Sequence, residues 1–138
     1  MRYPLRLDDL LFNRTNSREL VGKTAIFTGE NAIYAGYLVR FHMADEINAY
    51  FANCIMNSAY HRKWCDTVKA DALGQSNINA TKLRSYVFPL APIKEQNAIV
   101  ERVDKLMAVI DELKKQVSEC KNQAEMLMQS VLREAFEN

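Results

Sequence analysis

Three residues have types that could form a metal site or a Cys/His nucleophile pair: Cys54, His61 and Cys65. They would share one face if residues 47–66 formed one uninterrupted helix, because side chains seven and four positions apart lie on the same side. Their spacing matches no zinc signature, and a fourth ligand is not evident. The Asn57-Ser58 pair is also expected to end the helix. We therefore expect structural cysteines and no bound metal.

Other catalytic patterns are missing from the sequence. Gly22-Lys23-Thr24 resembles the end of a phosphate-binding loop, but Ser17 stands where that loop needs a glycine. There is no dinucleotide fingerprint, nucleophile elbow or His-Glu-x-x-His pattern. Carboxylates such as Asp66 and Asp71 have no pairing that spacing reveals. We therefore expect a protein that is not an enzyme and that holds no cofactor.

Two polar segments carry side chains that can bond phosphate oxygens and base edges. One is Asn13-Arg14-Thr15-Asn16-Ser17, and the other is Gly74-Gln75-Ser76-Asn77, which Asn79 follows. Both are expected to be loops, and ordinary solvated turns are the alternative explanation. A basic set could also line a nucleic-acid surface or form a solvated face; it comprises Arg62, Lys63, Lys69, Lys82 and Arg84, with Trp64 beside it.

Length and charge exclude several classes of protein. The chain has 138 residues, 18 Lys+Arg against 17 Asp+Glu, and 49% hydrophobic residues. This balance argues against bulk-charge binding of nucleic acid and against a disordered chain. No run of 18 apolar residues exists and the N-terminus lacks the apolar core of a signal peptide, so we expect no membrane contact, a cytoplasmic location and free thiols.

Residues 1–91 are expected to form a small mixed α+β domain. Strands are predicted over residues 6–12 and 86–88, and a hairpin over residues 24–43, with its turn at residues 28–31. A helix is expected from Asp45 through Ile55, followed by a second one that Ser58 caps. Asn79 can cap a short helix through Leu83, so its role is structural in that interpretation.

The last segment predicts a long helix, because no Gly or Pro interrupts residues 93–136 and Pro92 can occupy the first turn. Ten positions spaced alternately by four and three residues are apolar or small: Ile99, Val103, Leu106, Ile110, Leu113, Val117, Cys120, Ala124, Leu127 and Val131. We call this set the seam. A 3.5-residue period over four heptads is typical of a coiled coil. A helix lying on its own domain is the alternative, and the sequence leaves parallel and antiparallel pairing open.

The order of these segments resembles a known family. Residues 11–17 followed by Leu20-Val21-Gly22-Lys23 resemble the middle of a target recognition domain in the specificity (S) subunits of type I restriction-modification systems. Residues 33–40 resemble that family's next strand, and residues 75–79 resemble its polar loop. Residues 88–96, followed by Ile99-Val100, resemble the start of its long helix.

This resemblance implies a non-catalytic protein that recognises double-stranded DNA. S subunits have two recognition domains, one for each half of a bipartite target, and two long helices that pair and set the distance between the half-sites. Methyltransferase (M) subunits, which bind S-adenosylmethionine and modify adenine, assemble with them, and restriction (R) subunits join to cleave DNA. The present chain corresponds to the later part of one recognition domain and to one helix.

We therefore expect residues 1–91 to be part of a recognition domain and residues 92–138 to be a coiled-coil spacer. The expected DNA-binding residues are Arg14, Thr15, Asn16, Lys23, Gln75, Asn77 and Asn79. The expected partners are DNA, M and R subunits, and a second copy or another S fragment. One alternative is a scaffold or decoy that binds M or S subunits without recognising DNA, and a more distant one is a cysteine-dependent enzyme.

Overall fold

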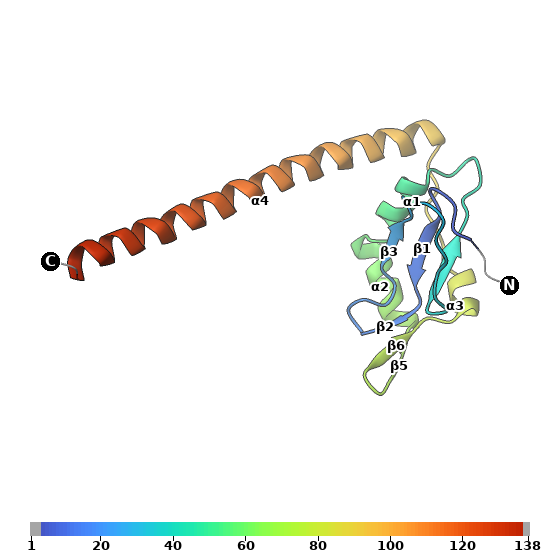
Figure 1. Cartoon of the computed structure of the whole chain (residues 1–138). Coiled ribbons are helices and arrows are strands. Elements are labelled where there is room, and N and C mark those ends of the chain that lie inside the picture. Colours follow the sequence, from blue (N-terminus) through green and yellow to red (C-terminus); the bar gives the residue numbers. More distant parts are fainter. Residues whose placement is uncertain (1–3, 137–138) are drawn as a thin grey trace. The chain divides into compact units, whose positions relative to one another are not determined.

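A computed structural model describes residues 4–136, and its chain divides into two compact units, residues 1–100 and residues 101–138. Figure 1 shows the elements. They are β1 (Leu10–Asn13), β2 (Thr15–Asn16), β3 (Thr24–Ile26), β4 (Leu38–Phe41), α1 (Ala49–Ile55), α2 (Ala59–Val68), β5 (Ala70–Ala72), β6 (Gln75–Asn77), α3 (Ala80–Arg84) and α4 (Ile93–Phe136). The predicted α+β class with a long C-terminal helix is confirmed.

The core of the first unit lies on a three-stranded antiparallel sheet in the order β3-β1-β4. The central strand β1 buries Leu10 and Phe12 completely, as strand alternation requires. The predicted hairpin over residues 24–43 is wrong, since β3 and β4 do not pair with each other. Each instead pairs with one edge of β1, so the backbone N–H and C=O groups of this buried central strand find partners on both edges.

The predicted strand over residues 6–12 begins only at Leu10. Residues 6–9 form a turn, in which the Asp9 N–H donates to the Arg6 carbonyl at 3.1 Å. Asp8 adopts a left-handed φ of 64°, which ends extended structure at this point. The segment predicted as a longer strand therefore includes a buried carboxylate, Asp9, that belongs to the turn.

A second, smaller sheet has the order β2-β6-β5 and is antiparallel throughout. The prediction of loops at residues 13–17 and 74–77 is therefore wrong for Asn13, for Thr15–Asn16 and for Gln75–Asn77, which are strands, whereas Gly74 does lie in a turn. Thr15 pairs with Asn77, and Asn16 pairs with Ser76. The polar composition that suggests loops is that of short strands, of which β5 and β6 are joined by a tight turn at Leu73 and Gly74.

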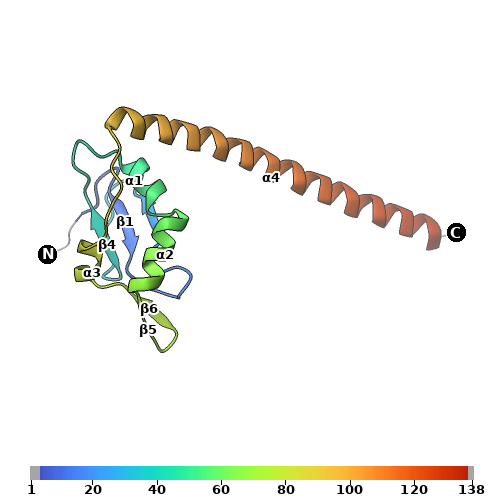
Figure 2. The same ribbon diagram turned by 180° about the vertical axis from the view of Figure 1, so that it is seen from behind.

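Helix starts follow their caps. Ser58 and Asn79 cap α2 and α3 as predicted, each accepting a hydrogen bond from a backbone N–H with its side-chain oxygen. The first helix starts at Ala49 and not at Asp45, because Asn48 is its cap and accepts from the N–H groups of Tyr50 and Phe51. Figure 2 shows α1 and α2 together on the same side of the larger sheet.

The predicted strand over residues 86–88 does not form. Tyr86 instead packs against Trp64, with ring centroids 4.6 Å apart, and Phe88 packs edge-on to Phe51 at 6.0 Å. Tyr86 and Phe88 are thus held by packing of their rings against the side of the core and not by backbone pairing. A buried ring needs no hydrogen-bonded strand to hold it.

The long helix α4 has the predicted bounds. Pro92 lies immediately before it, and its carbonyl accepts from the N–H groups of Glu95 and Gln96. Within the second unit the helix exposes most of its seam side chains, including Leu113 and Val117, whereas Val103 is half-buried. None of the helices in residues 4–136 combines the length and apolar character that a bilayer span needs.

Candidate nucleic-acid interface

The small sheet brings three of the predicted DNA-binding residues together. In an antiparallel pair, residues directly opposite each other project to the same face, and so do alternate residues of one strand. Thr15 and Asn77 are directly opposite, and Gln75 is two residues from Asn77. These three side chains therefore lie on one face, which we call the polar face. The Asn77 Nδ2 donates to Thr15 Oγ1 at 2.6 Å, and this bond fixes the orientation of the amide.

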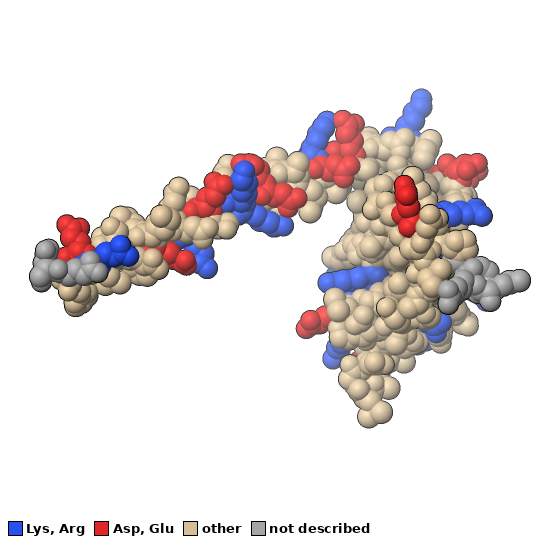
Figure 3. All heavy atoms as spheres, in the orientation of Figure 1, with Lys and Arg blue, Asp and Glu red and all other residues tan. Residues whose placement is uncertain are grey.

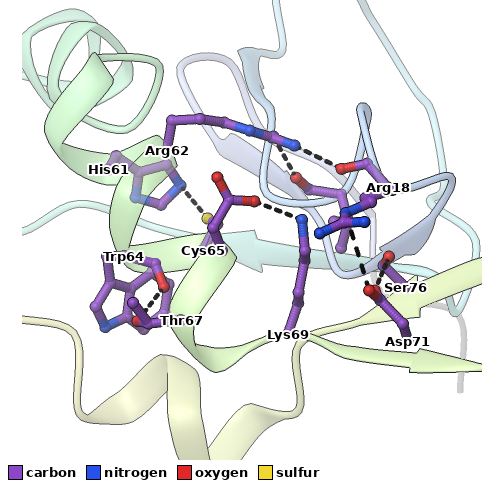
Figure 4. Close-up of polar contacts among 11 residues, drawn as sticks. Arg18, His61, Arg62, Trp64, Cys65, Thr67, Lys69, Asp71 and Ser76 are labelled. Atoms are coloured by element: carbon purple, nitrogen blue, oxygen red, sulfur yellow. Dashed lines mark hydrogen bonds and ion pairs between the residues drawn. The ribbon is translucent and has the colours of Figure 1, made fainter.

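Asn16 lies on the opposite face of the same sheet. It pairs with Ser76, and Ser76 is also paired with Asp71. The Asn16 side chain accepts from the N–H of Ser17 at 2.8 Å, and the Ser76 hydroxyl donates to Asp71. Arg18 approaches the same carboxylate, with its Nε 3.9 Å from the Asp71 Oδ2 (Figure 4). This face is therefore occupied by internal contacts.

Arg14 connects the two sheets through its backbone. Its N–H donates to the Tyr37 carbonyl at 3.0 Å, and its carbonyl accepts from Ile78 at 2.9 Å. Within residues 4–136 its guanidinium makes no hydrogen bond or ion pair. Arg14 thus has a fixed Cα position next to the polar face, while its charged group is available to an external anion.

Lys23 and Asn79 do not lie on the small sheet. Lys23 is exposed just before β3, and its carbonyl accepts from the N–H of Asn13 at 3.0 Å. The Asn79 Oδ1 accepts from the Lys82 N–H at 2.9 Å, so its capping role accounts for its presence. Five of the seven predicted residues therefore lie together on or beside β2 and β6. The other two, Lys23 and Asn79, lie apart from this cluster.

Much of the basic set has a structural role. The Arg62 guanidinium donates to the carbonyls of Val21 and Arg18, and Lys82 Nζ donates to the Val68 carbonyl. Lys69 Nζ pairs with Asp66, and Figure 4 shows that contact. Charge attraction would otherwise make these groups the first candidates for phosphate contacts. Within the described part of the chain Lys63 and Arg84 are exposed and have no such contact, and Lys82 is exposed although it bonds the Val68 carbonyl.

The candidate Cys/His group is divided between two helices, because the chain leaves the helix before Asn57 and Ser58 as expected. Cys54 lies on α1, whereas His61 and Cys65 lie on α2. His61 Nε2 is 2.9 Å from the Gly22 carbonyl and 3.2 Å from Cys65 Sγ, in the buried core. Among residues 4–136 no three His, Cys, Asp or Glu side chains are grouped to hold a metal ion.

Burial controls the ionisation of this pair. Desolvation lowers the pKa of His61, and the nearby Arg62 charge acts in the same direction, against the hydrogen bond to Gly22. Desolvation raises the pKa of the Cys65 thiol to about 11. A fully buried thiol with this pKa stays protonated near neutral pH and is a poor nucleophile.

Two buried polar residues were missed by sequence reasoning. Asp9 has a fully buried side chain that accepts from the Arg6 N–H at 2.8 Å and lies 3.0 Å from His42 Nδ1. Gln96 is buried at the start of α4, where its amide donates to the carbonyls of Glu46 and Ala91. The sequence does not indicate that either residue is buried, because a single polar residue among polar and apolar neighbours resembles a surface residue.

The sequence of this chain is related to those of known proteins. The chain belongs to the type I restriction modification DNA specificity domain family, whose model matches residues 4–120. It is 32% identical over 139 residues to the StySPI specificity subunit of Salmonella potsdam and to the EcoKI specificity subunit of Escherichia coli strain K12. Each alignment covers 98% of this chain.

A third relative is the putative MjaX specificity subunit of Methanocaldococcus jannaschii, 28% identical over 119 residues, which are 84% of this chain. All three are named as type I restriction enzyme specificity subunits. The family resemblance predicted from the sequence is thereby confirmed. The chain spans about 30% of the length of the first two relatives.

Proposed function

We propose that this chain is a DNA sequence-recognition module of a type I restriction-modification complex and is not itself an enzyme. The polar face carries the proposal, because it presents a hydroxyl and two amides on one side of a short sheet. Amide groups can form paired hydrogen bonds with adenine edges in the major groove, and hydroxyls can bond several bases. Membership of the DNA specificity domain family over residues 4–120 supports the same role.

Base contacts and phosphate contacts are divided between different residues in this proposal. Thr15, Gln75 and Asn77 contact base edges, because side-chain amides and hydroxyls distinguish bases by donor and acceptor patterns. Arg14 and Lys23 contact phosphates, and Asn16 supports the sheet from its other face. Positive charges near phosphates position a protein on DNA without distinguishing sequences.

We further propose that residues 1–91 form the recognition domain and residues 92–138 a coiled-coil spacer. The exposed seam supports pairing with a second long helix, since a row of Leu, Ile and Val side chains is unfavourable in water. The partner helix belongs to a second copy of this chain or to another S fragment. Methyltransferase and restriction subunits complete the complex.

The internal chemistry of the chain supports a non-catalytic role. Cys65 is buried and has a raised pKa, and His61, 3.2 Å away, is also buried and has a lowered pKa. Neither group is exposed to a substrate in the described structure. In this proposal the adenine-modifying chemistry of the complex resides in the methyltransferase subunits.

The function is tested by selection from a random duplex DNA library. The full chain is assembled with the methyltransferase subunit of its own system, and bound duplexes are recovered and sequenced. We expect one defined sequence to be enriched with the chain and to be missing from the methyltransferase subunit alone. An assembled complex that enriches no sequence would contradict recognition and would favour a scaffold or decoy.

A further inference from the structure

The turn of the β5–β6 hairpin has an unusual residue at its tip. Leu73 and Gly74 join the two strands, and both have left-handed backbones, with φ of 46° and 84°. Glycine adopts this conformation freely, whereas the Cβ of leucine clashes with the neighbouring carbonyl. Two-residue turns of this type favour Asn or Asp at the first position. Leucine is thus an unfavourable choice for the backbone.

Packing does not compensate for that strain. Leu73 is 106% exposed, the highest value of any large apolar residue that the structure describes. A Cβ built on the adjacent Gly74 would meet no atom within 4 Å, so the tip projects into open space. A side chain that is strained and also exposed to water stabilises nothing within the chain. Such positions are typical of contacts with another molecule.

The hairpin has the shape and charge of a ribbon that can enter a DNA groove. On one face of its first strand, β5, both side chains are the methyl groups of Ala70 and Ala72, so the ribbon is thin next to the tip. Its single carboxylate, Asp71, pairs with Arg18 and accepts from the Ser76 hydroxyl, which reduces repulsion from phosphates. In Figure 3 this end of the first unit is free of red and blue atoms around its tip.

We propose that Leu73 is a specificity-determining residue that packs against the C5-methyl group of a thymine in the major groove. The proposal rests on the DNA-recognition function proposed above and adds one base to it. A two-stranded ribbon fits the major groove, and the thymine methyl is the one apolar group that bases present there. Gln75 follows the turn and lies on the polar face, so it contacts a base close to that thymine.

The experiment uses the complete chain assembled with its methyltransferase subunit and the duplex selected from the random library. Each thymine of that duplex is replaced in turn by deoxyuridine, which removes only the methyl group. Binding is measured at fixed salt for the wild type and for Leu73→Ala and Leu73→Asn. Val87→Ala is the matched control, because Val87 is also an exposed apolar residue but lies outside the hairpin.

We expect one thymine at which deoxyuridine weakens wild-type binding about fourfold, the effect of one buried methyl-sized group. The same replacement has no effect on Leu73→Ala. Leu73→Asn raises the melting temperature of the chain, because asparagine tolerates the left-handed turn, and still weakens binding of the unsubstituted duplex. Opposite effects on stability and affinity exclude simple misfolding as the cause. Val87→Ala binds as the wild type does.

Three results would overturn the inference. In the first, Leu73→Ala and the wild type respond equally to deoxyuridine at every position. In the second, the selected sequence contains no thymine. In the third, Leu73→Ala fails to assemble with the methyltransferase subunit, which would make Leu73 a protein-contact residue. Failure of the wild type to select any sequence would instead contradict the proposed function itself.

Discussion

At the scale of single residues, Asp9 makes the stability of the first unit depend on pH. Burial raises the pKa of its carboxyl, but the Arg6 N–H, His42 and the Arg40 guanidinium together outweigh burial and lower that pKa below its usual 3.8. A lowered folded-state pKa contributes stability above the unfolded value, and this contribution is lost as the pH falls through the folded value. The wild type should therefore lose stability below pH 3.8.

Asp9→Asn tests this contribution, since it keeps the volume of the side chain and removes its charge. We expect the free energy of unfolding near neutral pH to fall by about 2 kcal/mol. The variant should also lose less stability than the wild type as the pH decreases. Denaturant unfolding of both proteins between pH 2 and pH 7 measures this, and parallel pH profiles would refute the assignment.

Gly22 is a second residue whose identity is fixed by its surroundings. It has a φ of +86°, and a Cβ built on it would lie 2.4 Å from Cys65 Sγ. Gly22→Ala should therefore lower the free energy of unfolding by about 3 kcal/mol, from overpacking and backbone strain together. Adding Cys65→Ala should recover part of this loss. Gly36→Ala is the matched control, because nothing lies within 4 Å of a Cβ at Gly36.

At the scale of elements, the Gln96 side chain connects the first turn of α4 to the segment before α1 by hydrogen bonds. Its Oε1 accepts from the Asn48 N–H at 2.8 Å, and its amide donates to the carbonyls of Glu46 and Ala91. Gln96→Ala leaves these groups without partners and should cost about 2 kcal/mol. Hydrogen exchange of the Asn48 amide should become faster. Asn97→Ala, which removes an exposed bond to Asn48, should change little.

Elements with local signals were predictable from the sequence, and elements that depend on distant pairing were not. Ser58, Asn79 and Pro92 mark helix starts, because each bonds to residues only three or four positions later in the chain and such local pairs can be recognised in the sequence. The pairing of β3 and β4 with β1 depends on which strand becomes the central strand of the sheet. No local sequence pattern predicts that choice. Short polar strands such as β6 resemble loops, because their stability comes from the partner strand.

The candidate site was predictable by residue type and only partly by position. The hydrogen-bonding groups of Thr15, Gln75 and Asn77 predict a role in DNA binding, and the register of β2 and β6 places these residues on one face. The side chain of Asn16 predicts the same role, but it lies on the other face, because side chains alternate along a strand. Leu73 was missed, since the sequence does not reveal a left-handed backbone at a leucine.

At the scale of the whole molecule, the exposed seam predicts self-association or pairing with another long helix. Leu113→Asp introduces a charge at a central seam position, which a paired helix would bury without a partner. We expect the wild-type chain to sediment as a dimer at micromolar concentration and Leu113→Asp as a monomer. Lys115→Glu changes a residue off the seam and should remain dimeric. A monomeric wild type would contradict pairing between copies of this chain.

The most direct test of DNA recognition compares the sequences selected by the wild type and by Asn77→Ala. Both full-length chains are assembled with the methyltransferase subunit and exposed to the same random duplex library at the same salt concentration. The wild type is expected to enrich one sequence, and Asn77→Ala, correctly folded and assembled, is expected to lose preference at one or more of its positions. Enrichment of the same sequence with the same affinity by both proteins would contradict the account.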